Sequence, residues 1–144
     1  MTLKSAVWLL VLATVAAGGP CLDRLWAAAA KIEWHSYEAG MARSRFEKKK
    51  VFIYFHAEWC AYCADMDRKT FTNPEVVAML NRSFIPIRVD ADRDKAAASL
   101  YRVKGLPHMV FLTEGGQEIG GVPGFIPPDQ MMKALTAVLT AAPK

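Results

Sequence analysis

Cysteine and histidine are both scarce in this sequence of 144 residues, which contains three of each. Only two of the cysteines, Cys60 and Cys63, lie close together, so the chain lacks the second cysteine pair or closely spaced histidine pair that would complete a four-ligand zinc site. Internal repeats and low-complexity tracts are also missing. The formal net charge of +4 is not gathered on a basic face with interleaved aromatic residues, which argues against nucleic-acid binding. What remains is one candidate cysteine site in a small protein.

A short apolar run lies at the N-terminus. Lys4 precedes the apolar residues 6–12, and small residues follow at positions 13–19. A charged start, a short apolar stretch and small residues are typical of a signal peptide, and this run is shorter than the ~20 residues of a membrane span. We expect residues 1–17 to be a signal peptide, cleaved after Ala17 to within two residues; an uncleaved membrane anchor is the alternative. Export predicts an oxidising compartment, for which we expect the bacterial periplasm.

Removal of a signal peptide leaves roughly 125 residues, enough for one domain with a core of its own. We expect a lead-in at residues 18–31 and the domain at residues 32–141. Cys21 lies in the lead-in and has no partner cysteine outside the Cys60–Cys63 pair. The Gly-Gly-Pro sequence before Cys21 lacks the aliphatic residue typical of a lipoprotein signal, so we expect neither lipidation nor a redox role for this thiol.

Alternating apolar segments predict a sheet with helices between its strands. The expected strands are residues 32–35, 51–57, 84–90, 109–112 and 118–119, with a hairpin around Gly115-Gly116 between the last two. The expected helices are residues 36–49, a piece beginning at Cys60, a piece opened by Asn73-Pro74, residues 92–101, and a last helix capped by Asp129. This order predicts an α/β fold with a mixed sheet and helices on both faces.

Side-chain patterns refine the expected elements. Pro86 has no N–H to donate, so its strand should lie at a sheet edge or be irregular. Near-helical spacing places Tyr37, Met41 and Phe46 on one buried face of the first helix, and Leu139 on the buried face of the last.

The cysteine pair stands where a strand hands over to a helix. Residues 51–55 are all strand-favouring, and the chain from Ala61 onward is compatible with a helix. The Cys60 sulfur would then face unpaired N–H groups and the positive end of the helix dipole, which favour the thiolate that attacks disulfides. Lowering a cysteine pKa from about 8.5 to about 7 amounts to roughly 2 kcal/mol. Cys63 lies one turn further on, close enough to form a disulfide with Cys60, so the pattern predicts thiol–disulfide exchange.

A metal-binding module is the second function class that we consider. Cys60 and Cys63, joined by His56 or His108, are suitable ligands for copper or zinc. A lone CxxC between a strand and a helix is nevertheless more typical of redox chemistry, and we expect no metal and no cofactor beyond the cysteines' own disulfide. Metal content set against turnover in a disulfide-reduction assay separates the two classes.

Residues 57–63, AEWCAYC, resemble the A-[ED]-W-C-x-x-C active-site motif of thioredoxin-fold proteins. The chain is most similar to the carboxy-terminal periplasmic domain of the DsbD family of thiol-reductant transporters, over about residues 32–139. Further matches are Thr70-Phe71, Pro74-Glu75-Val76, Val89-Asp90, Gly105-Leu106-Pro107 and residues 121–125. The resemblance implies the thioredoxin fold, with a central mixed β-sheet flanked by helices on both faces.

The resemblance also implies a role for each motif residue. Cys60 would be the attacking nucleophile and Cys63 the resolving thiol. Pro107 would match the family's cis-proline, whose loop faces the disulfide, and Leu106 and Trp59 would shape the docking surface. The implied partners are oxidised protein substrates and a membrane thiol-reductant transporter as electron donor. We expect a monomer.

The strand before the motif departs from the family pattern. Tyr54 stands where thioredoxins carry a buried Asp that exchanges a proton with the resolving cysteine, and a group with a pKa near 10 is a poor base. His56, on the same strand face, could take that role, or both residues could simply pack. Glu58 and Asp67 are the nearest carboxylates in sequence. His108 follows the cis-proline position and could tune the thiolate or contact substrate.

The residues between the cysteines indicate the direction of electron flow. Ala61-Tyr62 contains no histidine or other cation, so the thiolate is less stabilised than in strongly oxidising family members. We therefore expect a reductase. A protonated His56 or His108 near the thiolate would argue for the opposite direction.

Overall fold

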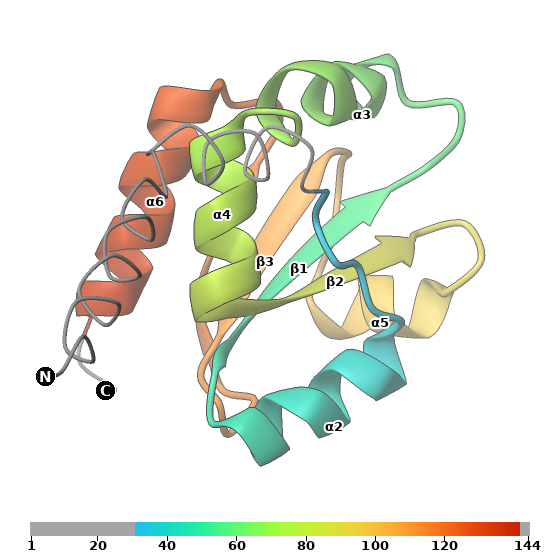
Figure 1. Cartoon of the computed structure of the whole chain (residues 1–144). Coiled ribbons are helices and arrows are strands. Elements are labelled where there is room, and N and C mark those ends of the chain that lie inside the picture. Colours follow the sequence, from blue (N-terminus) through green and yellow to red (C-terminus); the bar gives the residue numbers. More distant parts are fainter. Residues whose placement is uncertain (1–30, 142–144) are drawn as a thin grey trace, which may run out of the picture.

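A computed structural model describes residues 31–141 (Figure 1). The expected signal peptide, most of the lead-in and Cys21 lie outside the described residues. Within the described range, no helix is both long enough and apolar enough to cross a membrane.

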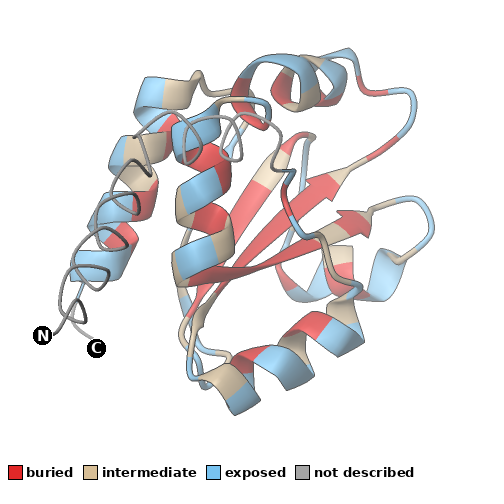
Figure 2. Cartoon of the chain, in the orientation of Figure 1, coloured by how far each residue is buried: buried red, intermediate tan, exposed pale blue. Residues whose placement is uncertain are grey.

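The centre of the fold is a four-stranded mixed sheet with the order β2-β1-β3-β4. The strands are β1 (Lys50–His56), β2 (Phe84–Asp90), β3 (His108–Leu112) and β4 (Glu118–Pro123). Strand β1 runs parallel to β2 and antiparallel to β3, and β3 and β4 form the expected hairpin. The apolar run at residues 51–55 is fully buried because β1 has a strand on each side and helices on both faces (Figure 2). Pro86 lies in β2, at the edge of this sheet, as its missing N–H predicts.

Helices cover both faces of the sheet, as expected (Figure 1). They are α2 (Tyr37–Glu47), α3 (Ala61–Asp65), the π-helix η1 (Met66–Thr70), α4 (Pro74–Ser83), α5 (Lys95–Leu100) and α6 (Pro128–Thr140). Alternation along β1 divides the core: Phe52 and Tyr54 pack with α3, η1, α4 and α6, whereas Val51, Ile53 and Phe55 pack with α2 and α5. The cysteine pair belongs to the first of these two cores.

Local capping signals explain where several helices begin. The Ser36 hydroxyl accepts a hydrogen bond from the N–H of Ala39 at the start of α2. The Asn73 side chain accepts from the N–H groups of Glu75 and Val76, and Pro74 occupies the first position of α4. The helix expected at residues 92–101 is shorter than predicted, because Asp94 caps α5 from inside that range.

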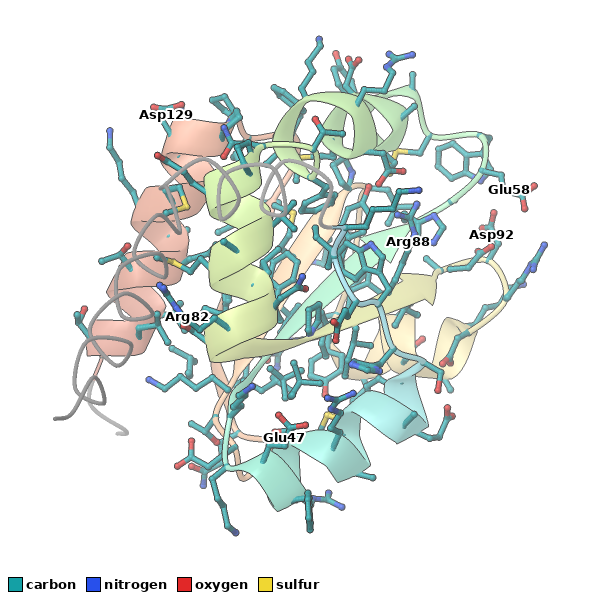
Figure 3. The ribbon with its side chains drawn as sticks, in the orientation of Figure 1. Glu47, Glu58, Arg82, Arg88, Asp92 and Asp129 are labelled. Carbon is teal, nitrogen blue, oxygen red and sulfur yellow. A yellow bond between two sulfur atoms is a disulfide. The ribbon has the colours of Figure 1, made fainter. Side chains whose placement is uncertain are left out.

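The strand expected at residues 32–35 and the cap expected at Asp129 also differ in the structure. Residues 32–35 do not form a strand: His35 alone makes a bridge to Ile87 of β2, because Ser36 starts α2 immediately afterwards. Asp129 does not cap the last helix. It lies inside the first turn of α6, because the helix begins at Pro128, two residues earlier than a helix capped by Asp129 would, and its N-cap is Pro127 (Figure 3).

Two residues expected on buried helix faces are exposed. Phe46 is 89% exposed, because α2 packs on β2 through its small residue Gly40, where even a Cβ would lie 2.3 Å from the Ile87 side chain. Leu139 is also exposed, since α6 turns Met131, Leu135 and Val138 inward instead.

Candidate active site

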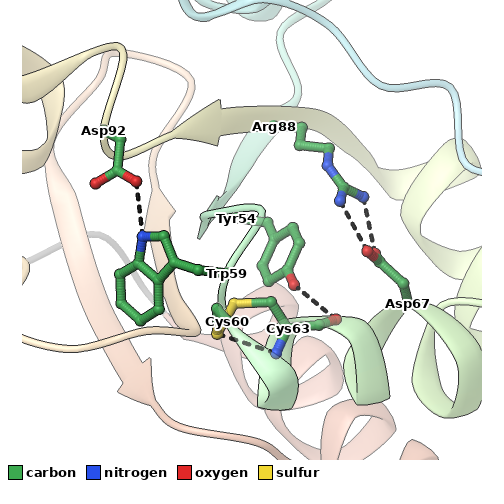
Figure 4. Close-up of a disulfide and its surroundings, with 7 residues drawn as sticks. All are labelled: Tyr54, Trp59, Cys60, Cys63, Asp67, Arg88 and Asp92. Carbon is green, nitrogen blue, oxygen red and sulfur yellow. Dashed lines mark hydrogen bonds and ion pairs between the residues drawn. A yellow bond between two sulfur atoms is a disulfide. The ribbon is translucent and has the colours of Figure 1, made fainter.

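The cysteine pair lies at the junction between the loop that leaves β1 and the first turn of α3 (Figure 4). Cys60 is the N-cap of α3, and Cys60 and Cys63 are joined by a disulfide with their Cα atoms 5.2 Å apart. The N–H of Cys63 donates to the Cys60 Sγ at 3.1 Å. Both residues are largely buried, Cys60 at 5% exposure and Cys63 at 2%. The Cys60 sulfur thus has a backbone N–H donor at a helix start, an arrangement that stabilises a thiolate after reduction.

Exposed aromatic side chains stand on either side of Cys60 in the sequence. Trp59 is 71% exposed, and its indole Nε1 donates to the Asp92 Oδ2 at 2.7 Å (Figure 4). Tyr62, between the two cysteines, is 65% exposed. Large exposed aromatic residues mark surfaces that bind other molecules, so this rim can receive a partner beside the disulfide.

The Leu106–Pro107 peptide bond is cis. Pro107 is buried, and its carbonyl accepts from the N–H of Gly124 at 2.8 Å. Leu106 is half-buried and packs against both cores. Strand β3 begins at His108, opposite Phe55 near the end of β1. The Leu106–Pro107 segment therefore lies at the same end of the sheet as the loop that leads from β1 to the cysteines.

Tyr54 of β1 lies in the same buried cluster as the cysteine pair. Its ring is fully buried, and its hydroxyl donates to the backbone carbonyl of Cys63 at 3.2 Å. Burial, reinforced by the nearby Asp67 carboxylate, raises the pKa of Tyr54 well above its ordinary value, and Arg88 opposes this only partly. Tyr54 therefore stays neutral and is a hydrogen-bond donor, not the base that the family's buried Asp would be.

His56 lies on the same sheet face, as the alternation of β1 predicts. Its imidazole stacks on the Tyr54 ring, with ring centres 5.7 Å apart. Burial lowers the pKa of His56, and the Arg88 cation lowers it further, while the carboxylates of Asp90, Asp67 and Glu58 act in the opposite direction. His56 is thus mainly neutral at pH 7.

Asp67 is held in an ion pair that the sequence did not reveal. Both of its carboxylate oxygens accept hydrogen bonds from the Arg88 guanidinium, each at 2.8 Å (Figure 4). The signal that could have revealed Arg88 is a charged residue between the apolar residues Ile87 and Val89 of strand β2. Asp92, the partner of Trp59, carries no such signal, because it lies among other acidic residues of the turn after β2.

The remaining two candidates do not converge on the disulfide. Glu58 is exposed and pairs with Arg93 at 3.2 Å, extending away from the domain (Figure 3). His108 shares the sheet face of Val110, opposite to that of Met109 and Tyr54, and its Nε2 packs over Gly121. Burial lowers the pKa of His108. The expected influence of His108 on the thiolate is therefore a poor fit, because the sheet separates the imidazole from the Tyr54 side of the site.

The copper or zinc alternative is not favoured by the geometry. Among residues 31–141, no three or more His, Cys, Asp and Glu side chains are grouped so that they could hold a metal ion.

Comparisons with known proteins agree with this geometry. The thioredoxin-like domain family matches residues 37–139. DsbD, the thiol:disulfide interchange protein of Haemophilus ducreyi, is 29% identical over 93 residues, which cover 60% of this chain and only 16% of that protein. A solved thioredoxin from Thermus thermophilus is 30% identical, with a TM-score of 0.71 over 76% of this chain and 88% of its own. The oxidised C-terminal domain of Neisseria meningitidis DsbD is 27% identical, with a TM-score of 0.58 over 69% of this chain and 90% of its own.

These matches confirm the expected thioredoxin fold and the resemblance to DsbD. The chain spans about one sixth of the length of the curated relatives that it matches. The chain belongs to the thioredoxin-like domain family and is similar to DsbD, and its Cys60–Cys63 disulfide supports thiol–disulfide oxidoreductase activity.

Proposed function

We propose that this protein is a periplasmic reductase that transfers electrons from its Cys60–Cys63 dithiol to disulfides in exported protein substrates. The observation that carries the proposal is the placement of Cys60 at the N-cap of α3, with the Cys63 N–H on its sulfur. A thiolate formed there is stabilised by a backbone N–H group, which permits exchange, while the intervening residues Ala61 and Tyr62 add no cation that would favour an oxidase.

The proposed reaction proceeds in two exchanges. The Cys60 thiolate attacks one sulfur of the substrate disulfide, forming a Cys60–substrate bond, while the electron pair of the broken bond leaves with the other substrate sulfur, which takes up a proton. Cys63, having lost its proton, then attacks the Cys60 sulfur and forms the Cys60–Cys63 disulfide. The substrate sulfur that was bonded to Cys60 leaves with the electron pair of that bond and is protonated. The substrate disulfide is reduced to two thiols and the cysteine pair is oxidised.

The surroundings of the pair support the division of roles. We assign substrate docking to Trp59, which is exposed next to Cys60, and to the Leu106–Pro107 segment, which lies at the end of the sheet from which the cysteine loop leaves. Tyr54 holds the carbonyl of Cys63 and so positions the resolving thiol. His56 is mainly neutral and His108 lies across the sheet, so neither supplies the protonated imidazole that would favour an oxidase.

The cellular setting is part of the same proposal. Residues 1–17 would direct export, residues 18–31 would lead into the domain at residues 32–141, and the family match over residues 37–139 fits that domain. A monomer that needs no cofactor beyond its own disulfide would be recharged by a membrane thiol-reductant transporter. That donor is consistent with the similarity to DsbD.

The test is the redox state of Cys60 and Cys63 in intact cells, measured by thiol alkylation in a Cys21→Ser background. We expect a largely reduced pair that becomes oxidised when the transporter is deleted, and a purified potential nearer to about −270 mV than to about −120 mV. The Cys60→Ser/Cys63→Ser variant fixes the alkylation baseline. A pair that stays oxidised with the transporter present would overturn the proposed direction.

A further inference from the structure

Strand β2 carries a charged residue, Arg88, on the face of the sheet that packs against the cysteine pair. Arg88 is the register partner of Tyr54 across β1 and β2, so the two side chains are neighbours on one face of the sheet. The guanidinium carbon lies 5.2 Å from the centre of the Tyr54 ring and 5.8 Å from the centre of the Trp34 ring. Two aromatic rings therefore line the guanidinium and remove part of its water.

The helical segment after the motif supplies the opposite charge. Asp67 follows Cys63 by four residues, about one turn along α3 and η1, so their side chains share a helix face. Arg88 holds the Asp67 carboxylate through two parallel hydrogen bonds of 2.8 Å. This is the fork geometry in which arginine binds carboxylates most specifically. The pair thus joins η1, the helical segment that follows the cysteine pair, to strand β2.

We infer that Arg88 is a positioning residue for the Cys63 thiol, which it serves by neutralising Asp67 and by bracing the Tyr54 ring. This inference rests on the proposed exchange at Cys60 and Cys63. In this protein the Arg88–Asp67 ion pair and the neutral phenol of Tyr54 would then position the resolving cysteine, a role that involves a buried Asp in thioredoxins.

The other charged groups around this pair are accounted for. Tyr54 and His56 of β1 are neutral near pH 7. Asp90, at the end of β2, and Glu58, in the loop after β1, both pair with Arg93. Each half of the Arg88–Asp67 pair thus has a predictable effect when its partner is removed.

The sign of that effect follows from electrostatics. An unpaired Asp67 carboxylate near Cys63 disfavours the thiolate, whereas an unpaired Arg88 guanidinium favours it. With both charges present the two effects oppose each other. Because Cys63 attacks as a thiolate, its rate of attack below its pKa follows the fraction ionised.

The experiment uses the reduced protein and an aromatic disulfide reagent whose thiol product absorbs light. Attack by Cys60 releases one equivalent of the coloured thiol, and ring closure by Cys63 releases a second, so stopped-flow absorbance separates the two steps. Each variant is measured across a range of pH. Cys63→Ser marks the first phase, because it cannot close the ring.

Three variants form a charge cycle. Arg88→Gln should slow the second phase by about fivefold at neutral pH and move its pH midpoint upward. Asp67→Asn should do the reverse, speeding the phase and moving the midpoint downward. Arg88→Gln/Asp67→Asn should return both close to the parent values. Arg102→Gln removes the same charge from the Arg102–Glu118 pair at β4, the opposite edge strand from β2, and should leave both unchanged.

A merely structural brace would behave differently, since every break of the pair would then change the rate in the same direction without rescue in the double variant. That result overturns the inference, as does an unchanged midpoint in Asp67→Asn. If Arg88→Gln fails to fold, Asp67→Asn decides alone: acceleration supports the inference and slowing or no change overturns it. Absence of the second phase in the parent protein would instead contradict the proposed exchange itself.

Discussion

The indole Nε1 of Trp59 donates to the carboxylate of Asp92 at 2.7 Å, joining the residue before Cys60 to the turn after β2. The partners are 33 residues apart in sequence. The ring is otherwise largely exposed, so burial does little to orient it. A hydrogen bond to a charged group contributes about 1.5–3 kcal/mol at most and less in contact with water. Its main consequence here is a fixed direction for the indole beside the disulfide.

Loss of the Asp92 carboxylate should therefore weaken substrate docking more than folding. We expect Asp92→Ala to lower kcat/KM for insulin reduction by about threefold to fivefold, equivalent to roughly 1 kcal/mol, with little change in Tm. Asp92→Asn retains an acceptor and should recover most of the activity. Reaction with a small aromatic disulfide, which needs no docking surface, is the internal control. Equal losses for insulin and for the small reagent would refute the docking role.

The two cysteines should give opposite results in a trapping experiment. Cys63→Ser leaves attack by Cys60 possible but prevents resolution, so mixed disulfides with substrate proteins should accumulate on non-reducing gels. Cys60→Ser should trap few or none, because Cys63 lies one turn inside the helix and is 2% exposed. The reverse pattern would mean that the roles of the two thiols are exchanged.

Removal of the Tyr54 hydroxyl should destabilise the fold modestly. Tyr54→Phe keeps the buried ring but loses the hydrogen bond to the Cys63 carbonyl, so we expect a loss of about 1 kcal/mol in the free energy of unfolding. Urea denaturation of the oxidised protein measures it. Tyr62→Phe is the matched control, since that hydroxyl belongs to an exposed side chain. A fully stable Tyr54→Phe variant would show that the hydrogen bond contributes nothing.

Stability should fall as the solution becomes acidic, partly through His56. Burial lowers the pKa of His56 in the folded state below the ordinary value of about 6.5. The unfolded chain then binds more protons than the folded one as the pH drops below about 6.5, so this contribution is complete above that pH and declines toward the lowered folded pKa. His56→Gln should reduce the decline in urea unfolding between about pH 7 and pH 5. A steeper decline in the variant would contradict the assigned direction.

Local sequence signals predicted much of this fold because their causes act within a few residues. The apolar side chains of residues 51–55 by themselves favour a buried strand. Asn73 caps α4 by accepting hydrogen bonds from the N–H groups of Glu75 and Val76, only two and three residues further on. Expectations were wrong where a neighbouring element decided the outcome. Residues 32–35 have a strand-like sequence, yet only His35 pairs, because α2 begins at once.

The motif at residues 57–63 placed the cysteine pair, and period-2 alternation placed Tyr54 and His56 on the same face. Alternation could not reveal that His108 faces the opposite side from Tyr54. That depends on the register between β1 and β3, which sequence spacing does not specify.

By itself, then, the sequence determined the redox chemistry, because a CxxC at a strand–helix junction is complete within a single turn of chain. Only the tertiary structure decided what tunes that chemistry. Arg88 reaches Asp67 across 21 residues, and this contact exists because β2 pairs with β1 in the register that sets Arg88 beside Tyr54. Electrostatic effects depend on distance in space, and spatial proximity between separate elements is created by the packing of the whole domain.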